Sequence, residues 1–277
     1  MIEALLLPFE LPFMRDAMLI GIIVAVPAAL LSCFLVLRGW ALMGDAVSHA
    51  VLPGVVLAYL AGVPLLVGAF ASGLFCAVAT GWIADNSRVK RDTVMGVVFS
   101  GMFGLGLVLF ATVRTDVDLH DILYGNMLGV GREDLIVSGA IAGTVTIALI
   151  AKWRDLLLHA FDPTQARTSG LRTGWLHYGL LAMLSLTIVG ALSSVGLILA
   201  IGLLIAPGAT AFLVTRSFGR MLAVSALVAT ASMAVGTWAS FHLDSAPAPT
   251  AILVLTILFL AAFAWRGIRA RRAEATA

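Results

Sequence analysis

Asp45 and His49 stand four residues apart within a mostly apolar segment that extends from Arg38 to Gly54. Four residues make about one helical turn, so both side chains project from the same helix face. Ionisable groups in membrane helices are functional candidates. A carboxylate and an imidazole together suit borderline divalent metals such as Zn²⁺, Mn²⁺ or Fe²⁺. Two ligands make a weak site, and a second subunit across a symmetry axis would double them.

Pro53 follows His49 by four residues, and a helical proline cannot donate to the carbonyl four residues back. At membrane depth that freed carbonyl is tolerated only where protein or a water-filled path satisfies it, and Gly54 would let another helix approach closely. Pro53 is therefore a candidate for a pathway or gate. Alternatively, Asp45 is a helix N-terminal carboxylate, His49 is a buried structural histidine, and the Ser48 hydroxyl bonds its own helix backbone.

The composition indicates that membrane helices carry these residues. Of the 277 residues 61% are hydrophobic and 12% are charged, and the mean hydropathy is +1.06, whereas a soluble domain carries about 25% charged residues. The sequence thus predicts a single all-α, polytopic integral membrane domain over 1–277 with eight or nine spans of about 20 residues. The candidates lie near 17–37, 45–62, 64–84, 93–113, 134–152, 175–192, 195–215, 220–241 and 248–266.

Basic residues predict the orientation, because Lys and Arg accumulate on the cytoplasmic side. With nine spans and the N-terminus outside, 14 of the 17 basic residues and the C-terminus are cytoplasmic; an eight-span version would move the N-terminus across. The other three are Arg15, Arg114 and Arg132. Residues 1–16 are expected to be an interfacial lead-in, because they lack the pattern of a removed signal peptide. Residues 267–277 are expected to be a basic cytoplasmic tail.

Further polar and special residues have two interpretations each. The acidic cluster Asp116, Asp118, His120 and Asp121 would draw cations to the entrance or contact a metal-delivering partner, or it is a solvated loop; His242 and Asp244 are similarly ambiguous. Pro207-Gly208 interrupts a span, as in transporter helices that line a substrate path, or is a structural kink. Cys33 and Cys76 lie in apolar runs and are expected to be packing residues. Two glycine-containing stretches, Gly96 to Gly106 and Gly139 to Gly143, are expected to be helix-packing surfaces.

Residues 155–172 contain a short helix in a predicted cytoplasmic loop. Asp162 is a good N-cap, Pro163 suits the first helical position, and Gly170 is a plausible stop. The alternative is a solvated connector whose cap is incidental.

Several motifs together resemble the permeases of the metal-type ABC importer family, which take up manganese, zinc or iron. They run in order along nearly the whole chain: Leu37-Arg38-Gly39 with Gly44-Asp45-Ala-Val-Ser48-His49-Ala-Val-Leu-Pro53-Gly54, then Asp118 to Gly129, Phe161-Asp162-Pro163-Thr-Gln-Ala166 with Gly170, and Val195-Gly196 to Pro207-Gly208-Ala-Thr210.

The resemblance implies roles for these positions. It implies that Asp45 and His49 handle the ion in the membrane, and it makes Ser48, which belongs to the same motif, a further candidate for the pathway or gate. It also implies that the short helix is the coupling helix that docks into an ATPase, with Phe161, Asp162, Pro163, Ala166 and Gly170 as its residues. The expected assembly is a homodimer in a bacterial cytoplasmic (inner) membrane, with the translocation path between subunits, two cytoplasmic ATP-binding subunits and an extracytoplasmic metal-binding protein. Lipid surrounds it, and no nucleic acid or permanently bound cofactor is expected.

The chain is not expected to be an enzyme, because no Gly-x-x-x-x-Gly-Lys-Ser/Thr loop occurs in its 277 residues. A separate subunit would hydrolyse ATP. One rival is a secondary, ion-coupled metal transporter without an ATPase, in which Asp45 and His49 form the coupling site; it gives the capped cytoplasmic helix no role. A membrane metalloenzyme would need a third ligand and a general base, as in His-Glu-x-x-His, which the sequence lacks. The identity of the ion stays open among Mn²⁺, Zn²⁺ and Fe²⁺.

Overall fold

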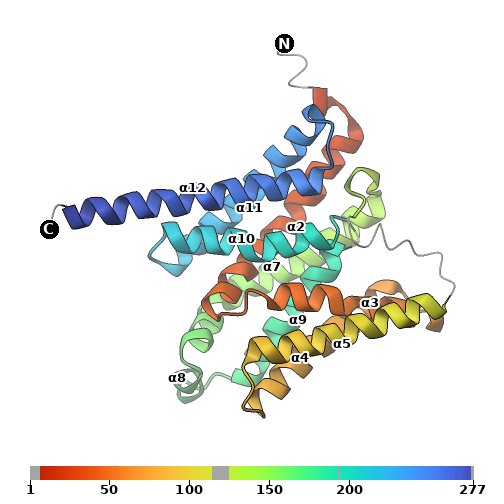
Figure 1. Ribbon diagram of the computed structural model, residues 1–277, viewed down its shortest axis with the longest axis horizontal. Coiled ribbons are helices and arrows are strands. Elements are labelled where there is room, and N and C mark those ends of the chain that lie inside the picture. Colours follow the sequence, from red (N-terminus) through yellow and green to blue (C-terminus); the bar gives the residue numbers. More distant parts are fainter. Residues whose placement is uncertain (1–6, 114–124, 193, 276–277) are drawn as a thin grey trace.

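The computed structural model describes residues 7–113, 125–192 and 194–275. Within these ranges the chain is helical, and nine helices are long and apolar enough to cross a membrane, as predicted (Figure 1). The elements, in chain order, are α2 (Pro12–Leu37), α3 (Met43–Ala61), α4 (Leu65–Asp85), α5 (Arg91–Thr112), the short 3₁₀ helix η1 (Met127–Gly129), α7 (Arg132–Phe161), the short α8 (Pro163–Thr168), α9 (Thr173–Leu192), α10 (Leu197–Val214), α11 (Phe218–His242) and α12 (Pro247–Ala275).

Helix α2 lies at the centre of the fold, with helices packed on two sides of it. On one side it packs against α10 and α11, which contact each other and α12. On the other side it packs against α7, which contacts α9. The helices α3, α4 and α5 pack on one another and form a separate group, and this group contacts α9 through α4 and α3. Figure 1 shows α12 and α5 at opposite edges of the molecule, and both are mostly exposed. Burial is therefore concentrated in α2, α3 and α9.

Glycines set the close crossing of α3 and α4. A Cβ built at Gly54 would overlap the carbonyl oxygen of Gly68, and one at Gly68 would overlap that of Gly54. The expectation that Gly54 lets another helix approach is thus confirmed. The Ser72 hydroxyl on α4 donates to the carbonyl oxygen of Ala50 on α3 at 2.6 Å, so a polar contact reinforces the crossing next to Pro53.

The expected interruption of a span at Pro207-Gly208 is wrong. Helix α10 continues through both residues, and Pro207 is buried inside it. Proline and glycine are tolerated within membrane helices that pack against their neighbours, and α10 packs closely on α2, where a Cβ at Gly208 would collide with the backbone of Ser32. Thr210 closes the turn locally, because its hydroxyl donates to the Ala206 carbonyl at 2.8 Å.

Several helices extend beyond the predicted apolar stretches. Helix α2 already begins at Pro12, within the expected lead-in 1–16. Helix α7 continues nine residues past 152, through Lys152 and Asp155, and ends at Phe161. Helix α12 continues through Ala275, so the expected basic tail is a helical extension. Charged side chains do not end a helix. They mark only the expected end of its membrane-spanning part. The acidic cluster between 116 and 121 lies outside the described residues.

Candidate functional site

Asp45 and His49 lie one turn apart at the beginning of α3, as predicted. The Nε2 atom of His49 is 3.4 Å from Oδ1 of Asp45, and about a quarter to a third of each side chain is exposed. Asp45 lies in the first turn of α3, where the helix dipole stabilises a carboxylate. His49 lies six residues after the first residue of the helix, or about 9 Å along its axis. The pair is therefore open to ligands near one end of a spanning helix.

Two aromatic side chains of α5 hold the His49 ring. Its centroid is 5.2 Å from that of Phe103 in an edge-to-face arrangement and 6.0 Å from that of Phe99. The Nδ1 atom of His49 is buried without a hydrogen-bond partner. The described residues contain no group of three or more potential metal ligands. One chain thus presents two ligands, Asp45 and His49, on the α3 face beside α5.

The three pathway candidates occupy different positions. The Ser48 hydroxyl is buried and donates to the Gly44 carbonyl of its own helix at 2.6 Å, as the alternative interpretation expected. Pro53 is buried within α3, and its Cδ atom faces Gly106 of α5. Pro207 is on α10, where the adjacent Gly208 packs on α2. Pro53 thus shares the α3–α5 interface with His49.

The short helix α8 has both of the predicted end signals. The Asp162 carboxylate accepts hydrogen bonds from the backbone N–H groups of Thr164 and Gln165, both at 2.9 Å, and Pro163 occupies the first helical position. Gly170 adopts a left-handed conformation with φ of +79°. The N–H of Gly170 donates to the Arg167 carbonyl and that of Leu171 to the Ala166 carbonyl, each at 3.0 Å. This is the Schellman pattern that satisfies the last carbonyls of a helix.

One face of α8 is anchored and the other is free. Ala166 is fully buried and α8 packs on α7 and α9. Phe161 is 69% exposed, and Asp162, Pro163 and Gly170 are exposed too. A capped helix with a fixed inner face and an apolar residue exposed beside it suits a rigid contact with another protein.

Residues 10–266 match the family model described as the ABC 3 transport family. The chain belongs to the ABC 3 transport family. The predicted resemblance to metal-type ABC importer permeases is thereby confirmed. The alternative of a secondary transporter is not favoured, because this is a family of ABC transport proteins.

Relatives in this family align over almost the whole chain. A Yersinia pestis protein, the chelated iron transport system membrane protein YfeD, is 52% identical over 262 residues, 95% of this chain and 88% of its own length. The manganese transport system membrane protein MntB of Synechocystis sp. is 43% identical over 256 residues, 92% of this chain and 83% of its own length. The solved structure of PsaBC from Streptococcus pneumoniae in complex with Fab superposes with a TM-score of 0.85 at 32% identity, covering 95% of each chain.

Arg38 has a structural role that sequence reasoning missed. Arg38 is the C-cap residue of α2. Its guanidinium donates to the His159 carbonyl at 3.2 Å and to Nδ1 of His177 at 3.5 Å. Its guanidinium also lies 4.5 Å from the centre of the Trp40 ring. Burial lowers the pKa of Arg38 to about 10, helped by the nearby charge of Arg91, so it stays protonated at neutral pH. The available signal was a charged residue two positions before a tryptophan, at the end of an apolar run.

Proposed function

We propose that the chain is the membrane-spanning permease subunit of an ATP-driven importer for divalent transition-metal ions. The ion would pass from an extracytoplasmic binding protein to the cytoplasm. The observation that carries the proposal is the Asp45–His49 pair, with its 3.4 Å separation and partly exposed side chains, in a chain of the ABC 3 transport family. Metal ions are the transported substrate, and the proposal includes no resident cofactor.

The pair offers an oxygen and a nitrogen ligand, which suits Mn²⁺, Fe²⁺ and Zn²⁺. Two of the relatives are named as iron and manganese transport proteins, which supports Mn²⁺ or Fe²⁺ as the ion. Zn²⁺ enters the proposal on ligand chemistry alone. His49 would bind the ion through an imidazole nitrogen. Its ring contacts Phe99 and Phe103, which restrict its rotation, and a fixed ligand ring favours a defined coordination geometry.

A homodimer would bring two such pairs together. Helix α5, beside the pair, is among the most exposed helices of the chain. It uses Gly106 to contact Leu52 and Pro53 of α3, whereas Gly96, Gly101 and Gly104 have nothing within 4 Å of a Cβ position. Small residues let helix backbones approach closely in a membrane. We place the second subunit against this face of α5, so that Asp45 and His49 line a path between subunits.

The proposed partners follow from the ends of the helices. The exposed, capped α8 would dock into a cytoplasmic ATP-binding subunit, one copy per permease chain. That subunit would hydrolyse ATP, since this chain has no Gly-x-x-x-x-Gly-Lys-Ser/Thr loop. The excess of basic residues on the α8 side supports a cytoplasmic location for that side and for the C-terminus. The whole would lie in the cytoplasmic (inner) membrane of a bacterium, since the named relatives are bacterial membrane proteins.

Co-purification tests this assignment. Tagged full-length chain, coexpressed with the neighbouring genes and extracted in mild detergent, should retain an ATPase subunit in equal amount. The variant Phe161→Asp should lose that subunit while keeping its own elution position, because it places a charge on the exposed surface beside α8. The matched variant Trp175→Asp changes another exposed aromatic residue outside α8 and should retain the ATPase. An importer whose ATPase stays bound to Phe161→Asp would contradict docking at α8.

A further inference from the structure

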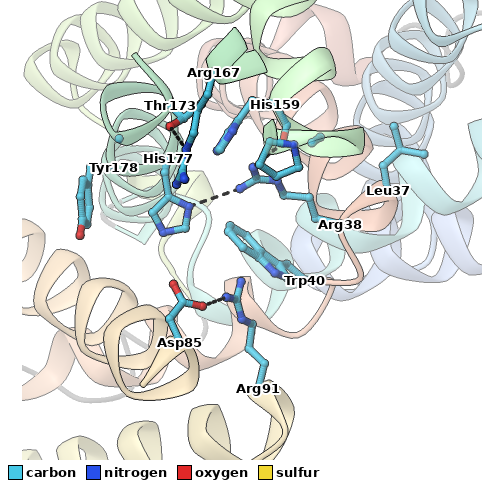
Figure 2. Close-up of a pocket in the computed structure, with 13 residues that line it drawn as sticks. Leu37, Arg38, Trp40, Asp85, Arg91, His159, Arg167, Thr173, His177 and Tyr178 are labelled. Carbon is cyan, nitrogen blue, oxygen red and sulfur yellow. Dashed lines mark hydrogen bonds and ion pairs between the residues drawn. The ribbon is translucent and has the colours of Figure 1, made fainter. Parts of the chain in front are cut away.

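A cavity separate from the Asp45–His49 pair lies beneath α8. Its volume is about 520 Å³, and the ends of α2, α4, α5, α7 and α9 surround it together with α8. Figure 2 shows its labelled side chains converging from these six elements. The cavity thus lies where the end of the helix before the metal motif meets the proposed ATPase-docking helix.

The charged groups that line the cavity are mostly positive. Three arginines and one carboxylate take part: Arg38, Arg91 and Arg167, with Asp85. The carboxylate is committed to Arg91, whose Nη2 lies 2.7 Å from Oδ1 of Asp85. Among the described residues, Arg38 and Arg167 have no carboxylate within ion-pair distance. Their hydrogen-bond partners are a carbonyl and a histidine nitrogen for Arg38, and the Thr173 hydroxyl at 3.1 Å for Arg167.

A buried histidine in the same wall lacks partners. The His159 side chain belongs to a residue that is only 6% exposed, and neither ring nitrogen has a hydrogen-bond partner. Buried polar side-chain atoms are normally hydrogen-bonded. One ring nitrogen of a neutral imidazole is a donor, and the Arg38 guanidinium bonded to the His159 carbonyl places positive charge next to this ring. The unsatisfied donor and the excess positive charge therefore point to the same kind of missing ligand, an oxyanion.

We propose that this cavity binds a phosphate group, with Arg38, Arg167 and His159 as its donors. Guanidinium groups match phosphate oxygens with paired N–H donors. Arg38 and Arg91 stack on the Trp40 ring at 4.5 and 4.8 Å, which orients them without neutralising their charge. Basic cavities between the cytoplasmic ends of membrane helices suit phospholipid headgroups.

Two sources could supply the phosphate group, an anionic phospholipid or free inorganic phosphate. The cavity is much larger than a phosphate ion, which takes up on the order of one to three water volumes of about 30 Å³ each. Tyr178, at one side of the cavity in Figure 2, is half-exposed, and Tyr residues are enriched at the membrane–water interface. These features favour a phosphatidylglycerol headgroup. The site stands apart from the transported metal, so metal-free protein suffices to test it.

The test uses delipidated full-length chain in detergent, titrated with short-chain phosphatidylglycerol, with phosphatidylcholine and with inorganic phosphate, and followed by native mass spectrometry. The variants are Arg167→Gln and His159→Phe. The matched control is Arg172→Gln, which removes the same charge from an exposed residue outside the cavity. Thermal unfolding of each variant checks its fold. His159→Phe should unfold no earlier than wild type, because neither nitrogen of the His159 ring has a hydrogen-bond partner to lose in the delipidated chain.

The wild-type chain should bind one phosphatidylglycerol saturably, and Arg167→Gln and His159→Phe should each bind it about tenfold more weakly, the loss typical of one hydrogen bond to a charged group. Arg172→Gln should bind as wild type does. Equal affinity of all four proteins, or equal weakening by Arg172→Gln, would overturn the site. Competition by millimolar inorganic phosphate at wild type but not at Arg167→Gln would assign the same site to the free anion.

Discussion

Gly54 of α3 and Gly68 of α4 are in direct backbone contact, and a Cβ on either glycine would overlap the carbonyl oxygen of the other. This crossing fixes the middle of α3 onto α4, so that the first two turns of α3 present Asp45 and His49 beside α5. The Ser72 hydroxyl, bonded to the Ala50 carbonyl at 2.6 Å, holds the same crossing from the α4 side. The position of the Asp45–His49 pair thus depends on residues that lie outside the pair itself.

Replacing Gly68 by Ala should destabilise the protein by about 1 to 3 kcal/mol, the usual penalty for overpacking. The backbone oxygen that the new Cβ meets cannot rotate away, as a side chain could. Thermal unfolding in detergent measures the effect. Gly219→Ala is the control, because a Cβ at Gly219 has nothing within 4 Å. If Gly68→Ala unfolded at the same temperature as Gly219→Ala, the close crossing would be wrong.

The number and order of spans could be predicted from the sequence, because about 20 apolar residues are needed for each crossing and the chain offers nine such runs. Helix ends were less predictable. Helix α7 continues past Lys152 and Asp155, because charged residues do not break a helix. It ends at Phe161, just before the Asp-Pro pair at 162–163. Pro207 was misjudged because proline is tolerated within a membrane helix that packs against its neighbours, and α10 continues through it.

Loss of the α8 cap should uncouple ATP hydrolysis from transport. Asp162→Ala removes the acceptor of two backbone N–H groups and should weaken α8 by about 1 kcal/mol; Pro163→Gly adds backbone freedom at the first helical position. The double variant, assembled with its ATPase in liposomes, should hydrolyse ATP with little metal uptake. The ratio of metal ions moved to ATP hydrolysed is the measurement.

Asp155→Ala serves as the control for the cap. It removes an aspartate that pairs with Lys152 at 3.2 Å on the exposed side of α7, and a surface pair of this kind contributes about 0 to 1 kcal/mol. Transport coupling should therefore be normal in this variant. A normal coupling ratio in the Asp162→Ala, Pro163→Gly protein would mean that the docking helix lies elsewhere.

A bulky side chain on the open face of α5 should block dimerisation without unfolding the chain. Gly101→Leu meets no atom within 4 Å of its Cβ in one subunit, but in the proposed dimer it would separate the two helices. Mass photometry or crosslinking in nanodiscs reports the subunit number. Gly219→Leu, on α11, should remain dimeric. Dimers of Gly101→Leu as stable as wild type would move the subunit interface away from α5.

The candidate site was accessible from sequence only in part. The spacing of Asp45 and His49 gives their common face on any helix, and it was confirmed. Nothing in the sequence indicated that Phe99 and Phe103, some 50 residues later, enclose the His49 ring, because that contact depends on how α5 packs on α3. The cavity around Arg38 and His159 was equally hidden, since six separate elements build it.

The identity of the transported ions should depend on the ligand set of the proposed homodimer, which contains two Asp45–His49 pairs. Carboxylate and imidazole without a thiolate accept Mn²⁺, Fe²⁺ and Zn²⁺ and disfavour Cu⁺. The Cys76 thiol is buried against α3, where it donates to the Ala46 carbonyl at 3.9 Å, and among the described residues it does not join Asp45 and His49 in a group of three potential ligands. Mg²⁺ favours oxygen ligands and gives up water reluctantly. In reconstituted importer with its binding protein, excess Zn²⁺ or Fe²⁺ should compete with Mn²⁺ uptake where it loads that protein, and Mg²⁺ should barely do so. Transport of Mg²⁺ as efficient as that of Mn²⁺ would contradict a transition-metal site.

Metal uptake by variants of the Asp45–His49 pair tests the central claim most directly. Asp45→Asn and His49→Ala, each purified with its ATPase and reconstituted with the binding protein, should lose uptake of radioactive manganese or iron while expression, dimerisation and ATP hydrolysis persist. Asp155→Asn, the same change in an aspartate that pairs with Lys152 on the exposed side of α7, should transport as wild type does. Near-normal uptake by either well-assembled pair variant would contradict a role of Asp45 and His49 in moving the ion.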